Sequence, residues 1–386
     1  MRCAVLILLV ACGGSAPAAG VDRAGAAAER GRAAALGMND VSILLPLPPA
    51  GGAPVLAGLD EGQIDRRWYD ALVGRRGDIG PRSGEAIAFE DFQVVAVRFD
   101  LCDRAAIGVC PRDAVGRLRL VLQPLYARDG ETFAHDVALH AFYPIAADEV
   151  SGVVEALRRL ARRGHAAPGA PLGVSPAAAA GDAAYLRGLR GLVGRYARAA
   201  ELVRLTVIGQ VADAAAFAWI FRGLDREGDG FVAMMIPGVA AAQQTVQLAG
   251  GDTVYRSAPI ADAPAGFALA TNGPRFAAAA PDERAAAVAA LAALQNPTLH
   301  DTVDTQCIGC HLATFLTARR AATSGIDPAA LPGWFATRAA AVPTIARQDA
   351  RVVRAFGWAG NAPAISQRVV NDTAEVLSEI AARFGP

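Results

Sequence analysis

The chain contains no lysine. All 37 of its basic residues are arginines, and 37 acidic residues bring the formal net charge of the 386-residue chain to zero. A nucleic-acid partner requires an excess of positive charge to meet its phosphates, so we expect no such partner. The composition is 53% hydrophobic and 19% charged, which is typical of a globular protein with an ample core. The length favours two or three domains.

The sequence also lacks the signatures of several enzyme classes. It has no G-x-S-x-G motif, no P-loop and no dinucleotide-binding fingerprint. The segment that begins at Asp225 places oxygen-bearing side chains and a glycine as the first half of an EF-hand loop does, but its twelfth position is Ile236. Without an acid at that position, and with strand-like runs on both sides, we expect a hairpin turn there.

The hydrophobic run at the N-terminus is too short to cross a membrane. Residues 3–11 are apolar apart from the cysteine, and the run is about half the length that a bilayer requires. Arg2 precedes it, and Cys12-Gly13-Gly14-Ser15 follows. This arrangement is typical of an export signal. We assign residues 1–11 to a signal peptide and expect the protein in the periplasm or cell envelope.

The stretch Leu9-Val10-Ala11-Cys12 resembles the bacterial lipobox, in which small residues precede a cysteine that is diacylated and becomes the new N-terminus. The resemblance implies that Cys12 anchors the protein to a membrane through lipid and that residues 12–39 form a tether. The alternative is an ordinary signal peptide that is cut nearby and leaves a soluble periplasmic protein.

The most specific chemical pattern lies near the C-terminus. Cys307-Ile308-Gly309-Cys310-His311 is a C-x-x-C-H, in which two thiols can add across the vinyl groups of a haem while the histidine reaches the iron. The motif and its helical setting resemble a minimal c-type cytochrome domain. The resemblance implies one covalent haem c, held by Cys307 and Cys310, with His311 as the proximal iron ligand. Haem attachment agrees with an export signal.

The other cysteines fit an exported protein. Cys3 leaves with the signal, which leaves Cys102 and Cys110 as a pair between two strand-like runs. An oxidising compartment favours a disulfide between them. Spacing alone does not establish the geometry of the bond, so a free pair is the alternative.

The sixth iron ligand is not evident from the motif. In soluble cytochromes c it is usually a methionine after the haem motif, but neither a methionine nor a histidine follows His311 here, and lysine is absent. His300 is the nearest candidate, and a methionine ligand is the second choice. The remaining upstream candidates are Met234, Met235, His135, His140 and His165. We expect His140, which alternates with apolar neighbours on a strand, to be a hydrogen-bonded sheet residue. An iron with an open face is the alternative.

The pattern of hydrophobic residues predicts an α+β fold with three parts. Residues 40–164 read as a small antiparallel-sheet-plus-helix module with the expected disulfide, and residues 182–276 as a second such module. A linker rich in Ala, Pro and Gly, residues 165–181, separates them. Residues 277–386 read as a mainly helical, cytochrome c-like domain. The expected strands are 92–99, 117–122 and 136–143 in the first module and 202–208, 217–223, 231–236, 245–248 and 253–256 in the second.

Three functions fit these observations. We favour an envelope-anchored monohaem cytochrome that passes single electrons to a redox partner protein, and so an electron carrier more than an enzyme. The first alternative is a haem sensor or peroxidase-like centre with an open iron face. The second is a thiol-disulfide or zinc site at the cysteines, for which His300 would be a further ligand.

Overall fold

A computed structural model describes residues 35–56, 62–74, 78–80, 87–101, 114–164, 169–212, 217–249, 254–259, 266–300, 305–335 and 349–385. Residues 34–386 form one compact unit. The expected lipidation of Cys12, the expected Cys102–Cys110 disulfide and the candidate ligand His165 lie outside the described residues.

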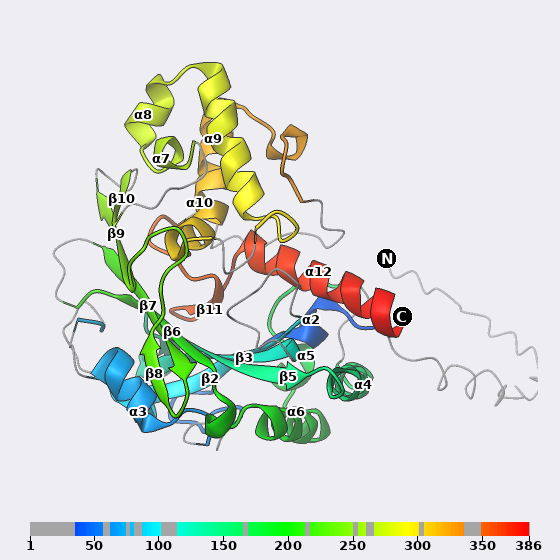
Figure 1. Ribbon diagram of the computed structural model, residues 1–386. Coiled ribbons are helices and arrows are strands. Elements are labelled where there is room, and N and C mark those ends of the chain that lie inside the picture. The colour runs from blue at the N-terminus through cyan, green and yellow to red at the C-terminus, as the bar shows by residue number, and fades with distance from the viewer. Residues whose placement is uncertain are drawn as a thin grey trace, which may run out of the picture. The chain divides into compact units, whose positions relative to one another are not determined.

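One antiparallel sheet of ten strands runs through this unit (Figure 1). Its neighbouring strands follow the order β1-β2-β3-β5-β6-β7-β9-β10, while β4 pairs with β3 and β8 pairs with β7. The strands are β1 Ser42–Leu44, β2 Phe92–Leu101, β3 Ala114–Arg128, β4 Glu131–Ala134, β5 Val137–Ala146, β6 Arg204–Gln210, β7 Ala218–Glu227, β8 Gly230–Ala233, β9 Gln243–Ala249 and β10 Val254–Ala258. A separate hairpin joins β11 Phe356–Ala359 to β12 Ala362–Ile365.

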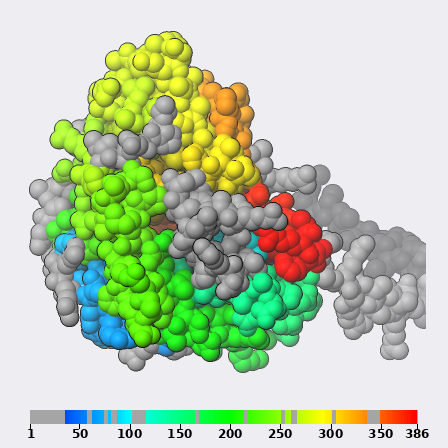
Figure 2. Space-filling model, viewed as in Figure 1, coloured from blue at the N-terminus to red at the C-terminus, as the bar shows by residue number. Residues whose placement is uncertain are grey.

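Helices cover both faces of the sheet. They are α2 Met38–Val41, α3 Arg66–Tyr69, α4 Val150–Ala161, α5 Pro176–Ala179, α6 Ala183–Tyr196, α7 Phe267–Ala270, α8 Gly273–Ala278, α9 Pro281–Leu294, α10 Cys307–Ser324 and α12 Gln367–Phe384. A π-helical turn, η1 Asp70–Gly74, and three 3₁₀ turns, η2 Phe89–Asp91, η3 Ala199–Glu201 and η4 Pro328–Ala330, complete the elements. In Figure 2 the yellow helices α8 and α9 lie above the green strands of the sheet.

Two hydrophobic cores lie on the two faces, because successive side chains of a strand point to opposite sides. On β5, Leu139 and Ala141 belong to the first core, which α4 and α6 cover, whereas Ala138 belongs to the second, which α7, α9 and α10 cover. Helix α12 contributes to both cores, with Val369 and Val370 in the second and Val376 and Ile380 in the first.

The prediction of two small modules is wrong, because one sheet is continuous across the expected boundary between them. β5 of the first expected module pairs with β6 of the second, from Val137 opposite Gly209 to Phe142 opposite Arg204. Each module alone would have exposed a long strand edge with unpaired backbone groups, and the pairing removes those edges. The helical C-terminal region packs onto the same sheet: α12 contacts α2, α4 and β2, and β11 contacts β2, β3 and β4.

The individual elements match the sequence pattern more closely than their assembly does. The predicted strands correspond to β2, β3 and β5 to β10. Asp129 and Gly130, with φ of 53° and 80°, form the turn that joins β3 to β4. The expected hairpin turn is also confirmed, since β7 pairs with β8 from Leu224 to Glu227. Within the described part of the chain, no helix combines the length and apolarity needed to traverse a bilayer.

Candidate functional site

The C-x-x-C-H motif begins helix α10, and the sheet fixes the start of that helix. Gln244 of β9 is fully buried. Its Nε2 donates to Oε1 of Gln306, the N-cap residue, at 2.7 Å, and its Oε1 accepts from the backbone N–H of Ile308 at 3.3 Å. Because a helix leaves its first N–H groups without intrahelical partners, this side chain both satisfies the helix end and sets its position. Cys307 is the first residue of α10, so the whole motif lies at the start of this helix.

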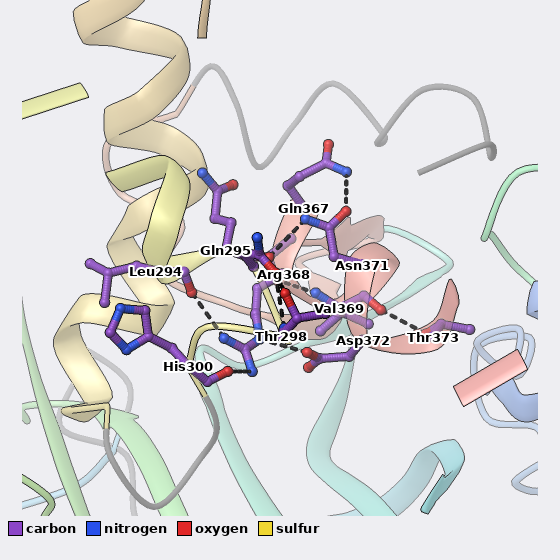
Figure 3. A network of polar contacts seen from close by, with 12 residues as sticks. Leu294, Gln295, Thr298, His300, Gln367, Arg368, Val369, Asn371, Asp372 and Thr373 are labelled. Carbon is purple, nitrogen blue, oxygen red and sulfur yellow. Dashed lines mark hydrogen bonds and ion pairs between the residues drawn. The ribbon is translucent and has the colours of Figure 1, made fainter. Parts of the chain in front are cut away.

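A buried polar network fastens α10 to α9 and α12. The side chain of Gln295 donates to Thr317 Oγ1 at 2.7 Å and accepts from Thr314 Oγ1 at 3.2 Å. Asn371 of α12 donates to the carbonyl of Gln295 at 2.7 Å (Figure 3). The backbone N–H of Gln367 donates to Thr314 Oγ1 at 2.9 Å. These bonds hold the motif helix rigidly against its neighbours, since a satisfied buried network admits few alternative arrangements.

His311 has the hydrogen bond that orients a metal-binding imidazole. Its Nδ1 lies 2.7 Å from the carbonyl oxygen of Val353. A carbonyl only accepts, so Nδ1 carries the proton and Nε2 keeps its lone pair. Burial lowers the pKa of His311 to about 4, which keeps the ring neutral at physiological pH. Phe221 of β7 packs against the imidazole at 5.1 Å between ring centroids.

The carbonyl that accepts this bond is itself held in place. Arg354, the next residue, donates to Asp136 Oδ1 at 2.8 Å. The hydroxyl of Tyr255 donates to the carbonyl of Ala350 at 2.6 Å, and the N–H of Ser366 donates to that of Ala355 at 2.7 Å. Outer partners of this kind fix the orientation of a metal-ligating histidine.

The motif faces a cavity between α10, α12 and the sheet. The cavity has a volume of about 970 Å³, including the space that opens to solvent. Cys307, Cys310 and His311 line it together with side chains from the sheet. The two cysteines are not joined by a disulfide. Burial raises the pKa of the Cys307 thiol to about 12. The sheet and α12 contribute mainly apolar, basic and imidazole groups together with one carboxylate, and these side chains include Arg98, Arg119, His140, Phe142, Arg204, Thr206, Ile208, Phe221, Met234, Arg368, Val369 and Asp372.

His140 lies on the floor of this cavity, which differs from the hydrogen-bonded sheet residue that the sequence suggested. Over the part of the chain that the structure describes, no hydrogen bond to its imidazole is found. Burial lowers its pKa well below the usual value, and the charges of Arg119 and His311 add to this effect. The ring is therefore neutral and has a lone pair to offer.

The other candidate ligands occupy different places. Met234 lines the cavity and is 6% exposed, whereas Met235 is 56% exposed and does not line it. His300 follows α9 and is not among the cavity residues; its carbonyl accepts from Arg368 Nη2 at 2.6 Å, and in Figure 3 its imidazole points away from Arg368. His135 stacks on Tyr126 with 4.2 Å between ring centroids, also away from the cavity lining.

A group of buried arginines adjoins the cavity, and none of its members is among the site residues that the sequence motifs indicated. Arg98, Arg117 and Arg119 contact the single carboxylate of Asp100 at 2.9, 3.2 and 2.7 Å. Burial would raise the pKa of Asp100, but the three guanidiniums hold it well below its usual range. The Nε atoms of Arg98 and Arg119 are buried without a hydrogen-bond partner. The group therefore carries more positive than negative charge next to the cavity.

A signal for these arginines is present in the sequence. Arg117-Leu-Arg-Leu-Val-Leu122 alternates polar and apolar residues, and such alternation marks a strand with one polar face. Only the packing of α10 and α12 onto that face shows that it is buried. Across the described residues, no three or more His, Cys, Asp and Glu side chains are placed to hold a metal ion by themselves.

Comparisons with known proteins return no match: no family model, no curated protein and no solved structure matches the chain.

Proposed function

We propose that the protein is an exported c-type monohaem cytochrome whose cavity receives one haem c. Cys307 and Cys310 hold the haem through thioether bonds, and Nε2 of His311 ligates the iron. The observation that carries the proposal is the hydrogen bond from His311 Nδ1 to Val353, because it leaves Nε2 as the free lone pair within a cavity that both cysteines line. When bound, haem supplies an iron that gains and loses one electron.

The residues of the cavity fit this group. Cys307, Cys310 and His311 line the cavity together, as a covalently held haem with a histidine ligand requires. Phe221, Ile208 and Val369 provide the apolar contacts that exclude water and raise a haem potential. The buried Nε atoms of Arg98 and Arg119 lack acceptors, and the two propionate carboxylates of a haem are acceptors of the matching charge.

The thiol-disulfide alternative fits less well. A thioredoxin-type motif belongs between a strand and a helix of a βαβ unit. Here the motif follows α9 and a loop, and the strand beneath it, β9, belongs to an antiparallel sheet. We therefore retain electron transfer to a redox partner in the cell envelope as the proposed role.

We also propose that Cys12 anchors the chain by lipid. Two acyl chains suffice for stable membrane residence, whereas one is marginal. Replacement of Cys12 by Ser should move the protein from the membrane to the soluble envelope fraction and should change its mature mass. Unchanged fractionation and mass would exclude the anchor.

The haem proposal is tested by producing the chain in a host with haem-attachment machinery. The wild type should show a cytochrome c spectrum and keep its haem on a denaturing gel, because thioether bonds survive unfolding. Cys307→Ser with Cys310→Ser should abolish both. Cys102→Ser with Cys110→Ser removes the same number of cysteines elsewhere and should leave haem in place. Purified protein with zinc or free thiols at residues 307 and 310 would contradict the proposal.

A further inference from the structure

We infer that His140 is the sixth ligand of the haem iron, so that the iron lies between one histidine of the sheet and one of helix α10; this inference rests on the proposed function.

The first support is the position of His140 within the sheet. It lies on β5, opposite Val121 of β3 on one side and Thr206 of β6 on the other. Thr206 in turn lies opposite Gly223 of β7. The residues beside His140 toward β7 are thus small. Met234 covers the Gly223 end of this row, and His140 lies at the other end.

The second support is that the imidazole of His140 makes no hydrogen bond to any residue that the structure describes. A side chain that has no hydrogen-bond partner within the protein keeps its polar atoms available for a ligand. In the described portion of the chain His140 has none, although it lies on a central strand. Part of its surface remains accessible because it faces the cavity. A role of His140 as a ligand of the iron would account for both features.

The third support is the proximity of the two imidazoles. His140 and His311 line the same cavity. His311 approaches from α10 above the sheet, whereas His140 rises from the sheet itself. Two ligands that belong to separate, rigid elements suit a group that is held between them.

The competing residues are less suited. The sulfur of Met234 packs on the sheet: a Cβ built on Gly223 would lie 3.1 Å from Met234 Sδ and 3.1 Å from its Cε. Met235 is exposed, and His300 does not line the cavity. His140 is therefore the cavity residue with a donor atom that packing does not occupy.

This ligand set has a functional consequence. Two imidazole ligands would occupy both positions of the iron that the porphyrin leaves open. The iron would then change little in geometry between its two oxidation states and would have no position for an added ligand. The inference thus favours an electron carrier over a sensor or peroxidase-like centre.

The test uses the full chain, produced with haem-attachment machinery, as wild type and as His140→Ala, His140→Gly, Met234→Leu and His300→Gln. We expect a low-spin wild type that binds carbon monoxide poorly. His140→Ala should keep covalent haem on a denaturing gel but become high-spin and bind carbon monoxide readily. Added imidazole should return His140→Gly to the low-spin state. His300→Gln, which removes a histidine outside the cavity, should remain low-spin, as should Met234→Leu.

The outcomes separate the ligand assignment from the proposed function. A low-spin His140→Ala protein, or a high-spin wild type, would overturn the role of His140 while covalent haem persists. A Met234→Leu protein that alone becomes high-spin would assign the ligand to the methionine instead. A wild type without covalent haem would overturn the proposed function and this inference together.

Discussion

The two faces of the sheet are built from alternate residues of the same strands, yet they are different environments. On β3, Leu118, Leu120 and Leu122 enter a dry core under α4 and α6. Arg117 and Arg119, between and beside them, enter the opposite face, where helices also exclude water. A polar face is usually solvated. A polar face under helices must instead satisfy its groups internally, and the groups that remain unsatisfied indicate where a ligand belongs.

The largest loss of stability should come from removing the carboxylate that the buried arginines share. Asp100→Asn would leave Arg98, Arg117 and Arg119 buried without their shared carboxylate. Removal of one partner from a buried ion pair costs about 3–5 kcal/mol. Urea unfolding should show this loss. Asp129→Asn is the control, since that carboxylate is exposed, and it should change stability by less than about 0.5 kcal/mol. A loss below about 1 kcal/mol for Asp100→Asn would show that the carboxylate is not needed.

A substitution on the face of the sheet that α4 and α6 cover should lower the stability of the fold and leave the haem spectrum unchanged. Leu139 is fully buried in the first core and precedes His140 on β5. Leu139→Ala should destabilise the fold by about 2–5 kcal/mol through lost packing and a cavity. The spin state of the folded protein should stay as in the wild type, because this side chain points away from the cavity. A changed spin state in the folded variant would mean that the two faces are not independent.

The pH dependence of the haem-free form should report on His311. Burial lowers the pKa of His311 in the folded chain to about 4, whereas the pKa of a histidine in the unfolded chain is about 6.5. The stability that comes from the neutral ring is therefore complete above about pH 6.5 and is lost as the pH falls toward 4. This amounts to about 3 kcal/mol, and His140 acts in the same direction. As the pH falls across this range, the denaturant midpoint should decrease more steeply for the wild type than for His311→Gln. Equal slopes for the two proteins would refute a buried, neutral His311.

The smallest effect should come from crowding the row beside His140. A Cβ on Gly223 would lie 2.9 Å from Thr206 Cγ2 and 3.1 Å from Met234 Sδ. Gly223→Ala should therefore cost about 1–3 kcal/mol by overpacking. Gly191→Ala, on the exposed face of α6 with open space around it, should instead stabilise by about 0.5–1 kcal/mol. Thermal unfolding of both variants distinguishes the two signs, and a stabilising Gly223→Ala would show that this row is loosely packed.

The sequence predicted local structure well and long-range assembly poorly. Alternation located the strands, because this pattern arises from neighbours in the chain. It did not indicate that β5 pairs with β6, since the Ala, Pro and Gly segment between them resembles a linker. Part of that segment packs instead: Val174 bridges to Leu44, and α5 contacts α6.

The candidate site shows the same limit. C-x-x-C-H is visible as a motif because its five residues are adjacent. The acceptor of His311 lies 42 residues away at Val353, and no local pattern marks it. His140 precedes the motif by most of two expected modules and looked like an ordinary strand residue. His300 was favoured because it is near in sequence, and distance along the chain is a poor guide to which side chains share a cavity.

The intact mass of the purified, denatured chain tests whether the cavity beneath α10 holds one covalent haem. We expect a mass that exceeds the mature polypeptide by one haem, with the added mass located by peptide analysis on the segment that contains Cys307 and Cys310. A chain that carries no added haem mass, although the host attaches haem to a control cytochrome c, would contradict it.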